Sequence, residues 1–264
     1  MKWWLLALVA VVGCTGTLPP LRHELEPGQD AYLIFEATGP DGLGELYASS
    51  PVGEKVIAVT FTPVAELAPA LSPDGVVIAF LRAGQPPNDS ASRRIWALNL
   101  LNGAERHLKL PDSAGTPRAL GWSHDGKQLY VRTDDTVWVM APPPGSGESH
   151  RLTAAERSGA DSALGTFVGR PAFARIVSCD STAGLCVRVP DGSEQPLAAG
   201  AHDPAAWGAD SVAYFLGDEV EIRPLGPGHP RVLRWSRPPR DPHWLNYFAG
   251  TGSSDTPAPP PGFR

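Results

Sequence analysis

The fold of this chain is decided by the stretch LSPDGVVIAFL at residues 71–81, where a Ser-Pro-Asp-Gly turn leads into an apolar run of strand length. The segments 93–99 (RRIWALN) and 103–110 follow as further short runs bounded by turn residues, which is typical of strands of about five residues. The stretch LGWSHDGKQLYV at 120–131 repeats the first run, and TVWVM at 136–140 repeats the second. The two Asp-Gly turns therefore mark a repeat of about 50 residues, a period that indicates a repeat architecture such as a propeller.

Fainter copies of this unit extend the repeat over most of the chain. One runs from 204 to 235, one lies within 168–197, and one lies within 31–61. Together they make five units of about 40 residues. The segment 241–250 is expected to supply either a last strand or a sixth, partial unit. The sequence thus predicts an all-β fold, a β-propeller of about five to six four-stranded blades.

The propeller follows from how such units can bury their surfaces. A lone sheet of three evident strands and a weaker fourth cannot cover both of its faces, whereas radial stacking of several sheets buries the faces against one another. Helices are not expected, because no segment shows sustained helical periodicity. The Ala-rich segments 64–70 and 201–209 are interrupted by Pro69 and Pro204.

The turn motif resembles the propeller repeat of the TolB family and its relatives, in which Ser-Pro-Asp-Gly precedes a β-strand. The first copy matches the pattern fully, and the second has His124 in place of the proline. The residues that carry this resemblance, each expected to have a structural role in a turn, are Ser72, Pro73, Asp74, Gly75, Ser123, Asp125 and Gly126. TolB is a periplasmic partner of an envelope complex, so the resemblance implies a binding role in the cell envelope.

The N-terminus has the layout of a secretory signal, with Lys2, an apolar stretch from Trp3 to Val12, and a small residue before Cys14. An apolar stretch of about ten residues is half of the ~20 that a membrane-spanning helix needs. The segment 11–14 (VVGC) resembles the bacterial lipobox, which implies that Cys14 carries the lipid anchor. The alternative is an ordinary signal peptide with an incidental cysteine.

These features predict four segments. Residues 1–13 form a lipoprotein signal peptide, 14–30 a lipidated tether, 31–250 the β-propeller, and 251–264 a disordered tail rich in Pro and Ser. Thr15 follows Cys14, and no acidic residue that would retain the protein in an inner membrane stands there. The resemblance therefore implies an exported protein held on the outer membrane and facing the periplasm.

Composition limits the classes of partner. Acidic residues outnumber Lys and Arg, 28 to 22, and the basic residues form no run. Proteins that bind nucleic acids normally show a basic footprint, so that class of partner is not expected. The chain has 28 Gly and 29 Pro residues but is 42% hydrophobic, which favours short strands joined by tight turns over disorder.

Two cysteines besides Cys14 lie close together in the sequence, Cys179 and Cys186, with Gly184 in the turn between them. β-Branched residues flank this turn, so the thiols are expected to meet across a hairpin and to form a disulfide in an oxidising compartment. A redox or metal role is the weaker alternative, because neither a CxxC spacing nor a neighbouring histidine is present.

No catalytic residue, metal site or cofactor is predicted. Ser123, His124 and Asp125 are consecutive, whereas a hydrolytic triad draws its members from distant parts of the chain. The seven histidines lack the HxxxH spacing of a helical zinc site. The pair Asp134-Asp135 is expected to be a solvated hairpin tip, with a calcium site as the alternative.

Aromatic residues fall into two groups. Trp96 and Trp138 occupy equivalent places in two repeats and are expected to pack between blades, with ligand stacking as the alternative. A second group falls outside the repeat pattern and is expected to be exposed as a possible recognition surface: Trp235, Trp244, Tyr247 and Phe248.

The function predicted from the sequence is a non-catalytic scaffold. It would be tethered to the membrane by the lipid on Cys14 and would bind an envelope protein, a peptide or a polysaccharide. The alternative is a propeller enzyme, a glycoside hydrolase or lyase acting on cell-surface carbohydrate; a third reading is a decayed, purely structural propeller. Clustered carboxylates at one mouth of the channel would favour the enzyme. Apolar and aromatic residues there would favour the scaffold.

Overall fold

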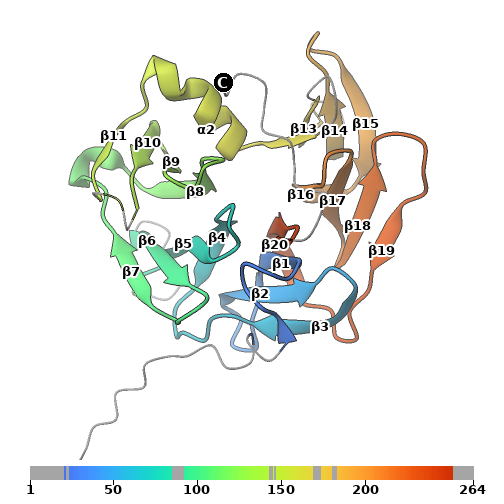
Figure 1. Cartoon of the computed structure of the whole chain (residues 1–264), viewed down its shortest axis with the longest axis horizontal. Coiled ribbons are helices and arrows are strands. Elements are labelled where there is room, and N and C mark those ends of the chain that lie inside the picture. The colour runs from blue at the N-terminus through green and yellow to red at the C-terminus, as the bar shows by residue number, and fades with distance from the viewer. Residues whose placement is uncertain are drawn as a thin grey trace, which may run out of the picture.

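The chain forms five antiparallel four-stranded sheets arranged as the blades of a ring (Figure 1). The computed structural model describes residues 21, 24–84, 92–142, 145, 147–168, 174–179 and 183–251. The prediction of an all-β propeller is confirmed, and the number of blades is five.

Each blade has one inner strand that faces the centre of the ring and three further strands outward. In hydrogen-bonding order, blade 1 contains β20 (Arg240–Phe248), β1 (Tyr32–Thr38), β2 (Gly44–Ser50) and β3 (Gly53–Ala58). Blade 2 contains β4 (Glu66–Leu71), β5 (Val77–Arg82), β6 (Arg94–Asn99) and β7 (Glu105–Leu108), and blade 3 contains β8 (Pro117–Trp122), β9 (Leu129–Thr133), β10 (Val137–Met140) and β11 (Ser149–Arg151). Blade 4 contains β12 (Thr166–Val168), β13 (Ala174–Ser178), β14 (Gly184–Arg188) and β15 (Glu194–Ala199), and blade 5 contains β16 (Ala201–Trp207), β17 (Ser211–Leu216), β18 (Glu219–Pro224) and β19 (Arg231–Leu233).

The core lies between the blades, which explains why the strands read as continuous apolar runs. In β5, Ile78 and Phe80 pack toward blade 1, whereas Ala79 and Leu81 pack toward blade 3. Successive side chains of a strand point to opposite faces, so a sheet with neighbours on both sides must be apolar at every position. Trp138 lies in the cluster between blades 2 and 3, as the sequence predicts.

The ring is closed by β20, the last strand of the chain, which pairs with β1 and becomes the inner strand of blade 1. Figure 1 shows red β20 beside blue β1, so that the last and the first strands of the ring are neighbours. Two of the aromatic residues predicted to be exposed are buried by this closure. Phe248 packs on Tyr32 at a centroid distance of 5.5 Å. Trp235 packs on Phe35 at 5.3 Å, and its Nε1 donates a hydrogen bond of 2.7 Å to Ser49 Oγ.

The predicted signal peptide and Cys14 lie outside the described residues, as does the tail beyond residue 251. The end of the predicted tether does not behave as a tether, because Leu21 and Leu25 are buried against the core between blades 1 and 2. They are four residues apart, and the Leu25 N–H donates to the Leu21 carbonyl at 2.8 Å. Within the described segments, no helix combines the length and the apolar character needed to cross a bilayer.

The two Asp-Gly turns have the same hydrogen bonds. In the first, Ser72 Oγ donates to Asp74 Oδ1 at 2.5 Å and accepts the Val77 N–H at 2.9 Å. In the second, Ser123 Oγ donates to Asp125 Oδ1 at 2.7 Å and accepts the Gln128 N–H at 2.9 Å. The serine and aspartate side chains therefore satisfy the polar groups of the turn, and Ser123 donates to Asp125 directly, without His124 between them.

The glycines of these two turns allow a matched test of blade packing. Gly75 and Gly126 have φ values of +67° and +70°, but a Cβ at Gly75 would lie 2.7 Å from the Phe248 ring, whereas at Gly126 the nearest atom is Pro73 Cδ at 3.8 Å. The left-handed conformation alone costs a non-glycine residue ~1–2 kcal/mol. Gly126→Ala is expected to lose that amount of unfolding free energy, and Gly75→Ala a further ~1–3 kcal/mol from overpacking against β20. Urea unfolding measures both, and equal losses would contradict the packing of this turn on β20.

A disulfide joins Cys179 and Cys186, as the sequence predicts, with their Cα atoms 5.1 Å apart. Cys186 pairs with Val177 in the ladder between β13 and β14, so the bridge runs diagonally across the hairpin. The bridge encloses a loop of eight residues, for which constraint of the unfolded chain contributes about 2–3 kcal/mol.

Candidate functional site

The inner strands of all five blades surround a central cavity of about 750 Å³. Its wall includes the segments 69–71 of β4, 119–122 of β8, 202–206 of β16 and 244–247 of β20, together with Thr166 of β12. The volume falls within the ~300–1,000 Å³ typical of sites that hold small ligands or short peptide segments. The cavity is therefore the candidate functional site.

Bulges in the inner strands shape this wall. Ala68 of β4, Asp203 of β16 and Asp241 of β20 have φ values of +50°, +48° and +47°, and each precedes a proline. Proline lacks an N–H, so it is tolerated on an edge strand and at bulges. In the sequence, Pro69 and Pro204 serve only as evidence against helices. Because each follows a bulged residue of an inner strand, these prolines also indicate the strands that line the cavity, and sequence reasoning missed this.

The wall of the cavity is rich in aromatic and apolar side chains. Trp122 donates from Nε1 to the Ala70 carbonyl at 2.9 Å, which joins β8 to β4. Tyr247 stacks on Trp207 with ring centroids 3.9 Å apart and an interplanar angle of 9°. Trp244 has a φ of +55° and is 38% exposed. Of the four aromatics predicted as a recognition surface, Trp244 and Tyr247 thus line the cavity, whereas Trp235 and Phe248 belong to the core.

Charged residues in the cavity wall are few and mostly basic. Arg132 and Arg175 are the basic residues that line it, His124 and His202 add two imidazole groups, and Asp203 is the one carboxylate among the lining residues that the structure describes. Glycoside hydrolysis needs two carboxyl groups ~5–9.5 Å apart across the scissile bond. The described wall offers one, Asp203.

A short helix that the sequence did not predict completes the wall. α2 (Arg157–Ala163) follows β11, and the residues at its C-terminal end, from Ser162 to Gly165, line the cavity. With seven residues it is too short for helical periodicity to be detected, but a capping box was readable: Thr153 and Glu156 satisfy each other's backbone N–H groups just before it. Gly121 of β8 lies directly under Ala163, where any side chain would meet the Ala163 carbonyl.

Three titratable side chains meet where blades 5 and 1 adjoin. His202 and Asp203 lie on β16 and His243 lies on β20; the Nδ1 atom of each histidine is 2.9 Å from Asp203 Oδ2. The two imidazole rings have centroids 5.2 Å apart. Sequence reasoning missed this cluster, because His243 is 40 residues from Asp203 in the chain and only the ring closure brings them together.

Glu36 of β1 lies beside this cluster, paired with His243 in the ladder between β1 and β20. Its Oε2 accepts the Ala68 N–H at 2.9 Å. Burial raises the pKa of Glu36 above its usual range, opposed by this hydrogen bond and by the nearby charge of His243. The Glu36 carboxyl group therefore connects blade 1 to the bulge at Ala68 of blade 2, and it is a second acidic group, besides Asp203, beside the two histidines.

Asp134, one of the two aspartates considered for calcium, forms an ion pair. Its Oδ1 lies 2.6 Å from Arg118 Nε, and this exposed pair, together with a hydrogen bond to Thr116, lowers the pKa of Asp134. This arrangement agrees with the interpretation of Asp134-Asp135 as a solvated hairpin tip.

Comparison with known proteins identifies the fold but no relative close enough to give a function. No protein-family model matches the chain, and no curated protein matches it. Among solved structures, TolB from Acinetobacter baumannii superposes with a TM-score of 0.57 and 14% identity, over 82% of this chain and 66% of that one. A putative TolB from Agrobacterium tumefaciens is 18% identical over 83% of this chain and 98% of that one, with a TM-score of 0.38. The chain thus spans about two thirds of the Acinetobacter protein, and its fold is that of a TolB-like β-propeller.

Proposed function

We propose that this protein is an exported lipoprotein, anchored through Cys14, whose propeller is a non-catalytic scaffold that binds a segment of another envelope protein in the central cavity. The observation that carries the proposal is the composition of the cavity wall, with several aromatic side chains and one described carboxylate. Aromatic residues supply large contact areas with little loss of conformational entropy, which is why they are enriched where proteins recognise one another.

The chemistry of the wall suggests what this segment contains. Trp244 and Tyr247 offer flat apolar surfaces beside Leu71 and Leu245, whereas His124 and Arg132 offer positive or hydrogen-bonding groups. A peptide segment with apolar side chains and at least one carboxylate would complement both parts of the wall. The enzyme alternative is less favoured because it needs two carboxylates that face the cavity, and Glu36, the acidic group beside Asp203, is not among the lining residues.

Site-specific photo-crosslinking in membranes tests this proposal. A photoreactive phenylalanine analogue at Trp244 is expected to form a discrete adduct with one envelope protein. The same analogue at Leu216, which is 41% exposed against 38% for Trp244 and lies outside the cavity wall, is the matched control and is expected to form none. A Cys14→Ser form should move from the membrane to the soluble fraction and lose the adduct if the partner is at the membrane.

The outcomes separate the two function classes. Equal adducts from positions 244 and 216 would contradict the cavity as the binding site. Binding or cleavage of soluble glycan fragments without any protein adduct would reject the scaffold and favour the carbohydrate enzyme. Membrane retention of the Cys14→Ser form would reject the lipid anchor while leaving the cavity test intact.

A further inference from the structure

The cluster of His202, Asp203 and His243 has the composition and geometry of a metal site. One ligand atom from each residue can be chosen so that all three lie within 4.8 Å of one another. Zinc bonds of ~2.0–2.1 Å in a tetrahedral site separate neighbouring ligand atoms by about 3.3 Å. The two observed nitrogen-to-oxygen distances of 2.9 Å are already near that value, so small side-chain rotations suffice to surround an ion.

The donor types select the class of ion. Two imidazole nitrogens and one carboxylate oxygen suit zinc and the neighbouring late first-row metals, whereas calcium and magnesium prefer sites made of oxygen alone. Cysteine does not compete within the described chain, because Cys179 and Cys186 are joined in the disulfide. Three protein ligands would leave one coordination position open, and His202 and Asp203 both line the central cavity.

The backbone at Asp203 is strained in a way that supports a role in ligand binding. Asp203 has a φ of +48° at a bulge in β16, where the register with β17 shifts between His202 and Ala205. A non-glycine residue in this region is strained by ~1–3 kcal/mol and persists only where the surrounding structure imposes it. Here the bulge turns two consecutive side chains, His202 and Asp203, toward the same neighbour on β20, which a regular strand cannot do because adjacent side chains alternate between faces.

We infer that His202, Asp203 and His243 bind one divalent transition-metal ion of the zinc class. The ion joins β16 of blade 5 to β20 of blade 1, the seam at which the two ends of the chain close the ring. Since the three ligands converge only after closure, the ion binds the folded ring and not the unfolded chain, and the stability of the ring rises with the logarithm of the ion concentration above the Kd. This inference goes beyond the proposed binding role and does not depend on it.

Metal titration of the full chain tests the inference. The protein carries Cys14→Ser, so that its thiol cannot bind the metal, and lacks any histidine tag; after chelation and dialysis it is titrated with Zn²⁺ by calorimetry and with Co²⁺ by absorption. One ion per chain is expected, with nitrogen and oxygen ligation in the cobalt spectrum. The melting temperature is expected to rise by about 5–10 °C at 100 times the Kd.

Matched variants assign the ligands. Asp203→Asn keeps a residue that tolerates positive φ, and His243→Ala removes a half-exposed ring; each is expected to weaken Zn²⁺ binding by more than ~10–100-fold, which is the loss of affinity seen when a residue that only hydrogen-bonds to a metal ligand is removed. His150→Ala is the control, because His150 also pairs with a carboxylate, Glu156, at 2.9 Å but has no third ligand among the described residues. The inference is overturned if the parent chain shows no saturable binding up to about 1 mM Zn²⁺, or if Asp203→Asn and His243→Ala bind Zn²⁺ as tightly as the parent chain does.

Discussion

A chain that ends at Pro239 is expected not to fold, because it lacks the strand that closes the ring. β20 supplies the inner strand of blade 1, and it contacts β16 and β4 on either side. Loss of Leu245 and Phe248 from the core removes ~1.5–3 kcal/mol each, and loss of the ladder to β1 removes ~1 kcal/mol for each hydrogen bond. The sum is of the same order as the ~5–15 kcal/mol that stabilises a typical domain.

Specific polar contacts add to this loss. Asn246 donates from Nδ2 to the Pro69 carbonyl at 2.9 Å and accepts the Leu71 N–H at 3.2 Å, so one β20 side chain satisfies the inner strand of blade 2. Without β20, the edge of β1 would also be open to pairing with other chains, which favours aggregation. We therefore expect the truncated chain to be insoluble or to lack a cooperative thermal transition.

The control is a chain that ends at Thr251, which keeps every described residue and the hydrogen bond of 3.0 Å from the Thr251 N–H to the Gln29 carbonyl. Circular dichroism in the near-ultraviolet and thermal unfolding compare the two truncated forms with the full chain. A cooperative transition in the form that ends at Pro239 would show that four blades and an incomplete first blade suffice, and would contradict closure by β20 as a requirement for folding.

This closure also marks the limit of what the sequence could predict. The Asp-Gly turns and the apolar runs identified the units that are continuous in the chain, because a repeated local pattern needs no knowledge of distant contacts. Blade 1 was incomplete in the sequence: its inner strand lies more than 200 residues after β1 and carries no repeat motif. The burial of Phe248 and Trp235 and the meeting of His202 with His243 all follow from this non-local pairing, so none of them was readable from local spacing.

The lining of the cavity also contains both residues that the sequence indicated and features that it did not. Trp244 and Tyr247 stood out in the sequence because they fall outside the repeat, and both line the cavity. The bulges that shape the inner strands place Ala68 and Asp203 at positive φ, and their one local signal, the proline after each, indicated only the absence of a helix when the sequence was taken alone.

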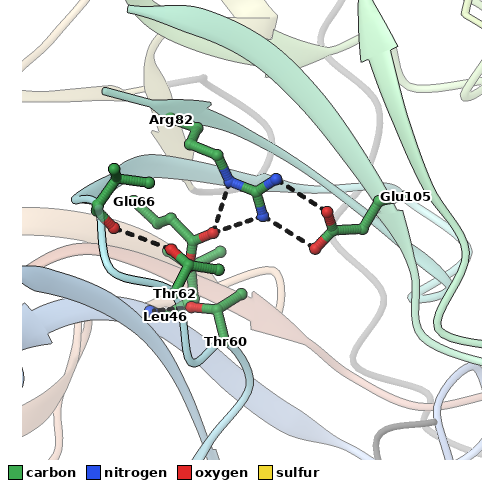
Figure 2. A network of polar contacts seen from close by, with 7 residues as sticks. Leu46, Thr60, Thr62, Glu66, Arg82 and Glu105 are labelled. Carbon is green, nitrogen blue, oxygen red and sulfur yellow. Dashed lines mark hydrogen bonds and ion pairs between the residues drawn. The ribbon is translucent and has the colours of Figure 1, made fainter. Parts of the chain in front are cut away.

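Replacement of Arg82 by methionine is expected to lower the unfolding free energy by ~3–5 kcal/mol at neutral pH, because it leaves a buried carboxylate without its ion-pair partner. Arg82 donates from Nε and Nη2 to Glu66 Oε1 at 2.8 and 2.6 Å, and from Nη1 and Nη2 to Glu105 at 2.8 and 2.9 Å (Figure 2). The Glu66 side chain is fully buried, whereas that of Glu105 is 33% exposed. The guanidinium also lies 4.5 Å above the Trp96 ring, so methionine keeps part of the packing but not the charge.

Glu105→Gln is the control for the exposed half of this network. It removes an ion pair that water partly screens, and such pairs contribute ~0–1 kcal/mol. A loss for Glu105→Gln as large as that for Arg82→Met would mean that the network acts as a unit and that the burial of Glu66 does not dominate. Urea unfolding at constant ionic strength measures both losses.

The pH dependence identifies Glu66 as the origin of the effect. Burial raises the pKa of Glu66, and Arg82 opposes that rise, so loss of Arg82 raises the pKa in the folded state further. A folded-state pKa above the unfolded value means that the folded state binds more protons, and stability is then lost as the pH rises through that interval. The difference in unfolding free energy between the parent chain and Arg82→Met should therefore be smallest below the ordinary pKa of glutamate, ~4.3, and should grow toward neutral pH.

A second variant tests this assignment. In the Arg82→Met background, Glu66→Gln should remove the pH dependence and recover part of the stability at pH 7, because a buried neutral amide needs no counter-charge. If the difference in unfolding free energy between the parent chain and Arg82→Met stays constant with pH, the loss comes from packing on Trp96 instead.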